Sequence, residues 1–245
     1  MRNIFAIDIG NTNVTCGLFR GRALVKKSKF PSHEAAFARR LVSFCGTCGS
    51  CEVIISSVEP RVLARALATL KKMCACRITI LGKDAAVPIR NLYRKPNEVG
   101  QDRLVNAFAT KILYGAPAVI IDFGTAVTFD VVSRRGEYLG GLILPGIEMS
   151  LESLHEKTAL LPKVELKPAS SIIGKDTVNS MRGGILFGLG AICDGLAARY
   201  RKTLGRDLKV IATGGNARLI KRYAKSIQVV DEDLTLKGLR LSSVC

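Results

Sequence analysis

The chain has 245 residues, of which 48% are hydrophobic and 23% are charged. This composition is typical of a folded globular protein and lacks the polar bias of disordered chains. No stretch reaches the roughly 18 uninterrupted apolar residues that a membrane helix needs. The first residues, MRNIFAIDIG, reach an acid and a glycine too early for a signal peptide. We therefore expect a cytoplasmic protein with no membrane association, in which the eight cysteines are reduced thiols.

The formal net charge is +17, from 37 Lys and Arg against 20 Asp and Glu. Such an excess attracts anions, and both nucleic acid and nucleotide are candidates. The basic residues are scattered along the chain, and only 6% of residues are aromatic, with no tryptophan on which bases could stack. We interpret the charge mainly as a basic solvated surface and expect no nucleic-acid partner.

Apolar runs and turn residues predict the element order β-β-β-α-β-α-β for the first half of the chain. Ser32 is a plausible N-cap for the first helix, and Pro60 opens the second. The predicted strands are 3–9, 14–19, 22–29, 52–57 and 77–81, and the predicted helices are 32–44 and 60–73.

A helix from about residue 101 to 115 leads into a second half, in which the strand pattern restarts. The predicted strands there are 118–122, 127–133, 137–144, 208–213 and 227–230, and the helices are 145–154, 178–203 and 216–224.

The two halves repeat at residue level. The segment 7–12, IDIGNT, matches the segment 121–126, IDFGTA, and the next turn glycines, Gly21 and Gly136, hold corresponding places. Strand, turn, strand and second turn all coincide, which indicates an internal duplication. The sequence therefore predicts an α/β protein of two related domains, 1–115 and 116–245.

In each half an apolar strand ends on an aspartate, and the chain then reverses through glycine. Gly10 and Gly124 allow tight turns that expose backbone N–H groups, which suits a phosphate ligand. Asp8 and Asp122 are anionic and cannot attract phosphate, so their sensible task is to hold a cation that bridges to it. The alternative is an ordinary hairpin turn in which the aspartate caps backbone N–H groups; two copies in register favour the ligand site.

Gly100-Gln101-Asp102-Arg103 is a third candidate, at the start of the helix between the halves. Arg103 could bind a carboxylate substrate through two hydrogen bonds, while Asp102 accepts a proton from an attacking hydroxyl. The alternative is an acid that complements the helix dipole beside a surface arginine.

Glycine-rich turns at 140–146 and 213–216 each precede a helix, where a base or ribose could lie against the backbone. A lone Gly-Gly turn is more often only a sharp corner. Five cysteines also stand at spacings that could bind zinc or an iron–sulfur cluster, with buried free thiols as the favoured alternative. They are Cys45, Cys48, Cys51, Cys74 and Cys76.

The ordered set of motifs resembles the type III pantothenate kinase family, within the superfamily of acetate and sugar kinases, Hsp70 and actin. The resemblance rests on IDIGNTNVTCGLF, Tyr93 followed by GQDR, IDFGTAVTFDVV, GGLILPGIEMS, GKDTVNSMRGGI and ATGGNA, which together span most of the chain. It implies two ribonuclease H-like, actin-like ATPase domains. It also implies transfer of the γ-phosphoryl of ATP to pantothenate, giving 4'-phosphopantothenate in the first step of coenzyme A biosynthesis.

The resemblance also implies roles for individual residues. Asp102 would be the general base, Asp8 would bind Mg²⁺ through water, and Asp122 would bind a monovalent cation, K⁺ or NH₄⁺. Thr177 would close the substrate pocket from the other subunit of a homodimer. The implied ATP-binding residues are Asp8, Ile9, Gly10, Asn11, Thr12, Asn13, Val14, Thr15 and Thr125, and the implied pantothenate-binding residues are Tyr93, Gly100, Gln101, Asp102, Arg103 and Thr177.

Two rival functions stay open at this point. One is a small sugar or acetate kinase of the same fold. The other is a catalytically idle regulator that binds nucleic acid through the +17 charge, although the presence of Asp8, Asp102 and Asp122 argues against idleness.

Overall fold

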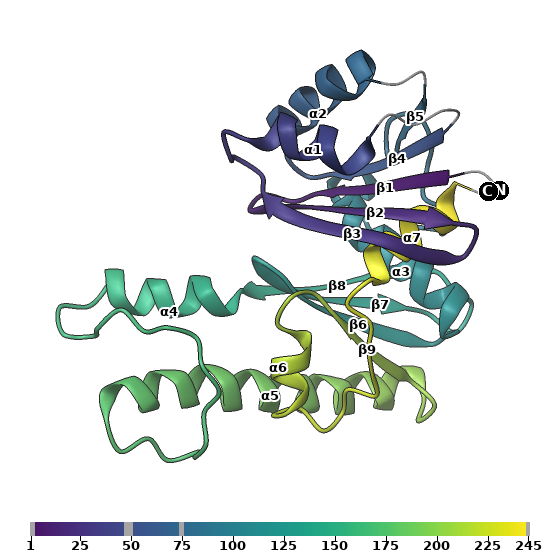
Figure 1. Cartoon of the computed structure of the whole chain (residues 1–245). Coiled ribbons are helices and arrows are strands. Elements are labelled where there is room, and N and C mark those ends of the chain that lie inside the picture. The colour runs from purple at the N-terminus through teal and green to yellow at the C-terminus, as the bar shows by residue number, and fades with distance from the viewer. Residues whose placement is uncertain (1–2, 47–50, 74–75, 244–245) are drawn as a thin grey trace. The chain divides into compact units, whose positions relative to one another are not determined.

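The computed structural model describes residues 3–46, 51–73 and 76–243, and it divides them into two compact units (Figure 1). The first unit runs to Ala109 and also contains the chain from Leu234 onward, whereas the second comprises Thr110–Asp233. This division differs from the expected halves, 1–115 and 116–245, because the C-terminal segment returns to the first unit.

The first unit is built on a five-stranded sheet with the order β3-β2-β1-β4-β5. The central strand β1 is antiparallel to β2 and parallel to β4. Its apolar residues are buried on both faces, as the near-continuous hydrophobic run predicts. The strands are β1 (Asn3–Ile9), β2 (Asn13–Arg20), β3 (Ala23–Pro31), β4 (Cys51–Ser57) and β5 (Arg77–Ile80).

Helices cover both faces of this sheet. α1 (Phe37–Cys45) and α2 (Pro60–Met73) share one core with alternate residues of the strands, including Phe5, Ile7 and Ile9. On the other face, α7 (Leu234–Ser242) packs against β1, β2 and β4, next to the first turns of α3 (Gln101–Leu113). Alternation along a strand therefore assigns Asp8, between Ile7 and Ile9, to the opposite face, on which α7 packs.

The sequence did not predict α7. Its segment LTLKGLRLS is short and contains Gly238, which ordinarily weakens a helix. Here glycine is required by packing, because a Cβ at Gly238 would lie 2.6 Å from Val105 Cγ1 of α3. This long-range contact leaves no periodic signal in the sequence.

The first helix begins later than expected. α1 starts at Phe37, with Ala36 at the N-cap and no side-chain cap, so the predicted N-cap role of Ser32 is wrong. Ser32 is fully buried and has another use, described below.

The second unit repeats the architecture of the first. Its sheet has the order β10-β9-β6-β7-β8, which reproduces the first order when strands are counted from the start of each unit. The confirmed fold is therefore two related α/β domains, each with a mixed sheet flanked by helices. The elements are β6 (Ala118–Phe123), β7 (Ala126–Val132), β8 (Tyr138–Pro145), α4 (Ile147–Glu156), α5 (Thr177–Leu204), β9 (Lys209–Thr213), α6 (Ala217–Lys221) and β10 (Val229–Val230); a short 3-10 helix, Pro96–Glu98, precedes α3 in the first unit.

Helix α5 is the longest element and is amphipathic only in part, with Leu186, Leu189 and Cys193 in the core of the second unit. Among the described helices, it alone is long and apolar enough to cross a membrane, and 39% of its most apolar window is buried. Core helices of globular proteins share this length and composition.

The cysteines behave differently from the expectation of eight reduced thiols. Cys51 and Cys76 form a disulfide at the starts of β4 and β5, where the parallel strands bring their Cα atoms within 5.0 Å. Cys16 and Cys193 are buried free thiols, and Cys45 is also buried. Within the described ranges no group of three metal-ligating side chains is present, and Cys48 and Cys74 lie outside them.

Candidate active site

Asp8 stands near the end of the central strand of the first unit, where sheet pairing places two hydroxyl residues beside it. It pairs with Thr15 across the antiparallel β1–β2 ladder and with Ser56 across the parallel β1–β4 ladder. Directly paired residues point to the same face of a sheet. Asp8, Thr15 and Ser56 therefore form a polar row among otherwise apolar strands.

The Asp8 carboxylate is held by Ser56. Ser56 Oγ donates a hydrogen bond to Asp8 Oδ1 at 2.7 Å, and the Ser56 side chain is fully buried. A hydrogen bond to the charged form favours ionisation and fixes the orientation of the carboxylate.

The loop that follows β1 is braced from the end of β3. Gly10 N–H donates to Asn13 O at 3.0 Å, which closes the turn. Ser32 Oγ donates to Gly10 O at 2.7 Å, and Ser32 N–H donates to Thr12 O at 2.9 Å. Asn11 and Thr12 are exposed at the tip of this tight loop. These hydrogen bonds use the carbonyl oxygens of Gly10, Thr12 and Asn13. Backbone N–H groups are therefore the main polar groups that the loop can offer to a phosphate.

Asp102 lies close enough to Asp8 for the two charges to interact, although 94 positions separate them in the chain. Burial and then repulsion from Asp102 raise the pKa of Asp8 to about 7, while the Ser56 hydrogen bond lowers it. Two carboxylates close together at the end of this strand favour the binding of a cation. A bound cation would offset both the burial of the Asp8 charge and its repulsion by Asp102.

The GQDR motif shapes the surroundings of Asp102. Asp102 Oδ1 accepts a hydrogen bond from Arg103 N–H at 2.9 Å. A Cβ at Gly100 would lie 2.5 Å from Asp102 Oδ1, so glycine is needed for the carboxylate to fold back over the start of α3. Gln101 packs on Gly82, whose φ of +82° also favours glycine.

The other residues implied for pantothenate lie in different environments. Arg103 is half-buried in the first turn of α3. Tyr93 is half-buried in the preceding loop, where its backbone N–H donates to Asn91 Oδ1 at 2.9 Å. Thr177 belongs to the second unit and is exposed as the first residue of α5, after the N-cap Asp176.

In the second unit, two glycine-rich turns converge on the loop after β6. A Cβ at Gly214 would lie 2.5 Å from Asp122 Oδ1 and 2.6 Å from Phe123 O, and Gly214 has a φ of +88°. A Cβ at Gly146 would lie 2.1 Å from the carbonyl oxygen of Thr125. The turns at 140–146 and 213–216, weak signals in isolation, therefore build one site around Asp122.

Asn216 and Glu148 connect these two turns. Asn216 Nδ2 donates to Glu148 Oε1 at 3.0 Å and to Oε2 at 3.2 Å. Glu148 stands in the first turn of α4 and Asn216 at the N-cap of α6. Their bond fixes two helix N-termini beside the Asp122 loop, where Thr125 is exposed.

Sheet register shows how the two sites correspond. Asp122 pairs with Thr128 on β7 and with Thr213 on β9. These partners match Thr15 and Ser56 around Asp8, so each unit places an aspartate between two hydroxyl residues at the same point of the same topology. The structural repeat therefore includes the hydroxyl residues on the neighbouring strands, whereas the sequence repeat related only the aspartates and their turns.

Ser32 and Ser56 were missed as site residues from the sequence. Ser56 carries a usable signal, since it lies near the end of a buried apolar strand, where a hydroxyl needs a partner. Ser32 has no comparable signal, because serine before a helix is ordinarily a cap.

A buried aspartate in the second unit was also missed. Asp130 is fully buried on β7 and accepts hydrogen bonds from Tyr138 OH at 2.8 Å and Thr128 Oγ1 at 2.9 Å. Thr128 is thereby fixed beside Asp122, its register partner.

Comparison with known proteins agrees with this geometry. A family model described as type III pantothenate kinase matches residues 4–199. The type III pantothenate kinase of Myxococcus xanthus is 39% identical over 97% of this chain and 96% of its own length. That of Syntrophus aciditrophicus is 38% identical over 97% of both chains.

Solved structures share the fold at low identity. A protein from Campylobacter jejuni described as a conserved Baf family transcriptional activator has a TM-score of 0.62 and 18% identity, covering 97% of this chain and 95% of its own. The inorganic polyphosphate/ATP-glucomannokinase of an Arthrobacter strain has a TM-score of 0.50 and 12% identity, covering 98% of each. At these identities the likenesses concern the fold alone. By the family match and the identity over nearly its whole length, the chain belongs to the type III pantothenate kinase family.

Proposed function

We propose that this chain, a kinase that phosphorylates pantothenate in coenzyme A biosynthesis, uses Asp102 as the general base of the transfer. The single observation that supports this role is the proximity of Asp102 to Asp8 at one end of the first sheet, close enough for the Asp102 charge to raise the pKa of Asp8. Phosphoryl transfer needs charge neutralisation at the phosphates and a carboxylate directed at the attacking hydroxyl. The two acids can divide these tasks between them.

In this mechanism the residues of the first unit position the reactants. Backbone N–H groups of the braced loop, with Thr12 and Thr15, would bind ATP phosphates, and Asp8 would bind Mg²⁺ through water. The ion, when bound, would neutralise charge on the transferring phosphoryl group. Asp102 would accept the proton of the primary hydroxyl of pantothenate as its oxygen attacks the γ-phosphorus. Arg103 would bind the carboxylate of pantothenate, with Tyr93, Gly100 and Gln101 lining the same pocket.

In the second unit, Asp122 would bind a monovalent cation, K⁺ or NH₄⁺, and Thr125 would contact ATP. The convergence of the Gly146 and Gly214 turns on this loop supports a site for a small cation near backbone oxygens. The carbonyl of Thr125 and the carboxylate of Asp122 are the hard oxygen ligands that such an ion requires.

We further propose that the protein works as a cytoplasmic homodimer in which Thr177 closes the pocket of the partner subunit. Exposed apolar side chains support this proposal, since Ile172 and Ile173 precede α5 and Ile192 stands on it. A large apolar surface on a globular protein indicates a contact surface.

The decisive test is Asp102→Asn with ATP and pantothenate as substrates. Loss of the base should lower kcat by about 10²- to 10⁴-fold, while nucleotide affinity, measured by titration calorimetry with a non-hydrolysable ATP analogue, should stay within a few-fold. Asp207→Asn is the matched control, because Asp207 is an exposed acid that pairs with Arg134 on the second unit. Unchanged kcat in Asp102→Asn would remove this residue from the base role. Turnover of a sugar with no turnover of pantothenate would overturn the substrate assignment.

A further inference from the structure

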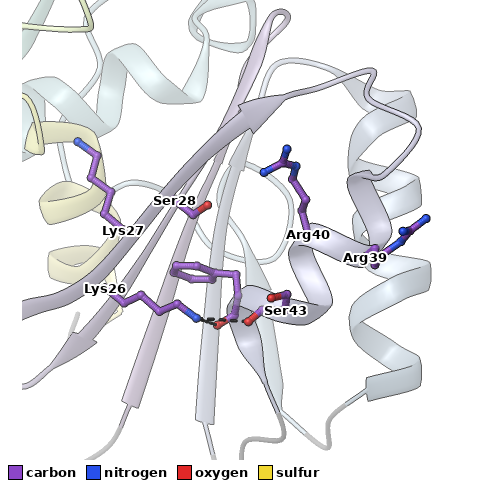
Figure 2. A pocket seen from close by; sticks show the side chains of 7 residues that line it. Lys26, Lys27, Ser28, Arg39, Arg40 and Ser43 are labelled. Atoms are coloured by element: carbon purple, nitrogen blue, oxygen red, sulfur yellow. Dashed lines mark hydrogen bonds between the residues drawn. The ribbon is translucent and has the colours of Figure 1, made fainter.

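A basic groove lies between the edge strand β3 and helix α1 of the first unit (Figure 2), and none of its lining residues belongs to the loop after β1. Its volume is about 360 Å³. This is in the range of small-ligand sites, which begin at about 300 Å³. The lining residues are Lys26, Lys27, Ser28, Arg39, Arg40, Ser43 and Phe44.

Two of the cations are directed to the groove and held there. In Figure 2, Lys26 extends from β3 toward the end of α1, and Arg40 rises from α1 on the side of β3. Lys26 Nζ donates to Phe44 O at 3.1 Å and to Ser43 O at 3.3 Å, and it lies 4.9 Å from the centre of the Phe44 ring. Lys26 thereby neutralises the carbonyl end of α1, which would otherwise repel an anion.

Arg40 keeps hydrogen-bonding capacity for a ligand. Its Nε contacts Glu34, at 3.1 Å from Oε1 and 2.9 Å from Oε2. Among the described residues, the two terminal nitrogens of Arg40 make no hydrogen bond, so a planar pair of donors is available for an oxyanion. Glu34 is the one carboxylate that the described ion pairs place next to these cations, so positive charge exceeds negative charge in the groove.

Edge-strand protection explains only part of this arrangement. Lysines on β3 blunt an exposed sheet edge against pairing with another chain. That role does not require arginines on the facing helix, nor serine hydroxyls from both walls of the same groove. Ser28 and Ser43 supply those hydroxyls, one from each element.

We propose that this groove binds a small phosphate-containing anion. Lys26, Arg40 and the hydroxyls of Ser28 and Ser43 would donate hydrogen bonds to the phosphate group. A small ligand fits better than nucleic acid, because the aromatic ring of the groove belongs to Phe44, which is only 4% exposed and cannot stack on a base.

The test is a titration of the isotopically labelled full chain with inorganic phosphate and with glycerol 3-phosphate, followed by amide NMR shifts at constant ionic strength. Shifts should appear at residues 26–28 and 39–44, and occupancy of the ATP loop would be seen separately at residues 8–15. Tighter binding of glycerol 3-phosphate identifies an organic phosphoester as the source, and the reverse order identifies free phosphate. Absence of saturable shifts at 26–28 and 39–44 overturns the proposal.

Two double variants distinguish specific binding in the groove from general attraction of anions by the net charge of +17. Lys26→Gln with Arg40→Gln should weaken binding about tenfold or more, since charge-assisted hydrogen bonds are lost. The control, Lys71→Gln with Lys72→Gln, removes the same charge from the exposed last turn of α2 and should leave affinity within about twofold. Equal weakening in both variants overturns the proposal, as does tighter binding of a single-stranded oligonucleotide through the same amides. The wild-type shift map decides the matter if the first variant fails to fold.

Discussion

Ser56 Oγ and Asp8 Oδ1 lie 2.7 Å apart, joined by a hydrogen bond between neighbouring parallel strands. The bond holds a carboxylate that burial and Asp102 both push toward its protonated form. Ser56 therefore acts as a positioning residue for the group that we propose to bind Mg²⁺ with ATP.

Ser56→Ala should weaken the binding of Mg·ATP. Loss of a hydrogen bond to a charged group costs about 1.5–3 kcal/mol, which corresponds to a rise in KM for ATP of roughly tenfold or more. Ser56→Thr keeps the hydroxyl and should recover most of the affinity. Steady-state kinetics with each substrate varied in turn checks this, and equal loss in the alanine and threonine variants would show that volume, not the hydroxyl, matters.

Stability without ligands should depend on pH through Asp8. Its pKa rises from 3.8 to about 7 on folding, so the folded state holds the proton more tightly than the unfolded state. The associated stability is present below about pH 4 and is lost as the pH rises through 7. Asp8→Asn cannot ionise, so it should be more stable than the wild type above pH 7 by up to about 4 kcal/mol, and this difference should disappear near pH 4.

Urea unfolding of the ligand-free proteins between pH 4 and 8 measures this difference. Asp207→Asn is a control of opposite sign, because the hydrogen bond from Arg134 lowers the pKa of Asp207. That variant should lose stability relative to the wild type as the pH rises. A pH-independent gain in Asp8→Asn would contradict a raised pKa of Asp8 in the folded protein.

Activity should require K⁺ or NH₄⁺. We expect kcat/KM to fall by an order of magnitude or more when Na⁺ replaces K⁺ at constant ionic strength and saturating Mg²⁺, because positioning and charge neutralisation are lost together. In Asp122→Asn the response to K⁺ should be largely abolished. Full activity in a sodium-only buffer would remove the monovalent ion from the mechanism.

Gly214→Ala should abolish activity by displacing the Asp122 loop that follows β6. A Cβ there would lie 2.5 Å from Asp122 Oδ1, and a φ of +88° is strained for alanine, so the loop must shift. Gly195→Ala is the matched control, since its Cβ would meet nothing within 4 Å on helix α5. The control should retain activity and gain roughly 0.5–1 kcal/mol in helix stability. Comparable activity in the two variants would show that the close approach at Gly214 does not matter.

A shared active site can be tested by complementation between subunits. Thr177→Glu, at an exposed helix start that accepts an acid, should repel the pantothenate carboxylate and leave the fold intact. When this variant is mixed with Asp102→Asn and the subunits exchange, about half of the dimers should be hybrids, each with one intact site of two. The mixture should therefore recover about a quarter of wild-type activity. Sedimentation supplies the oligomeric state, and no recovery in demonstrated hybrids would place Thr177 outside the partner's pocket.

Local patterns determined much of the protein. Buried apolar runs ending in Asp8 and Asp122, each followed by glycine, were sufficient to predict the strands, the repeat and the two aspartate loops. Strand alternation and turn chemistry are short-range properties, so a single sequence can express them. The family resemblance and the two-domain fold followed from the same motifs, and the comparisons confirm both.

Tertiary structure decided what depends on contacts between distant segments. Ser32 donates a hydrogen bond to Gly10 O and does not cap a helix. Cys51 and Cys76 form a disulfide because β4 and β5 are parallel neighbours. Asp102 came near Asp8 only in the folded chain, and burial with like charge then set the pKa of Asp8. Sequence spacing carries no record of such distances, since the free energy of each contact depends on groups that the fold alone brings together.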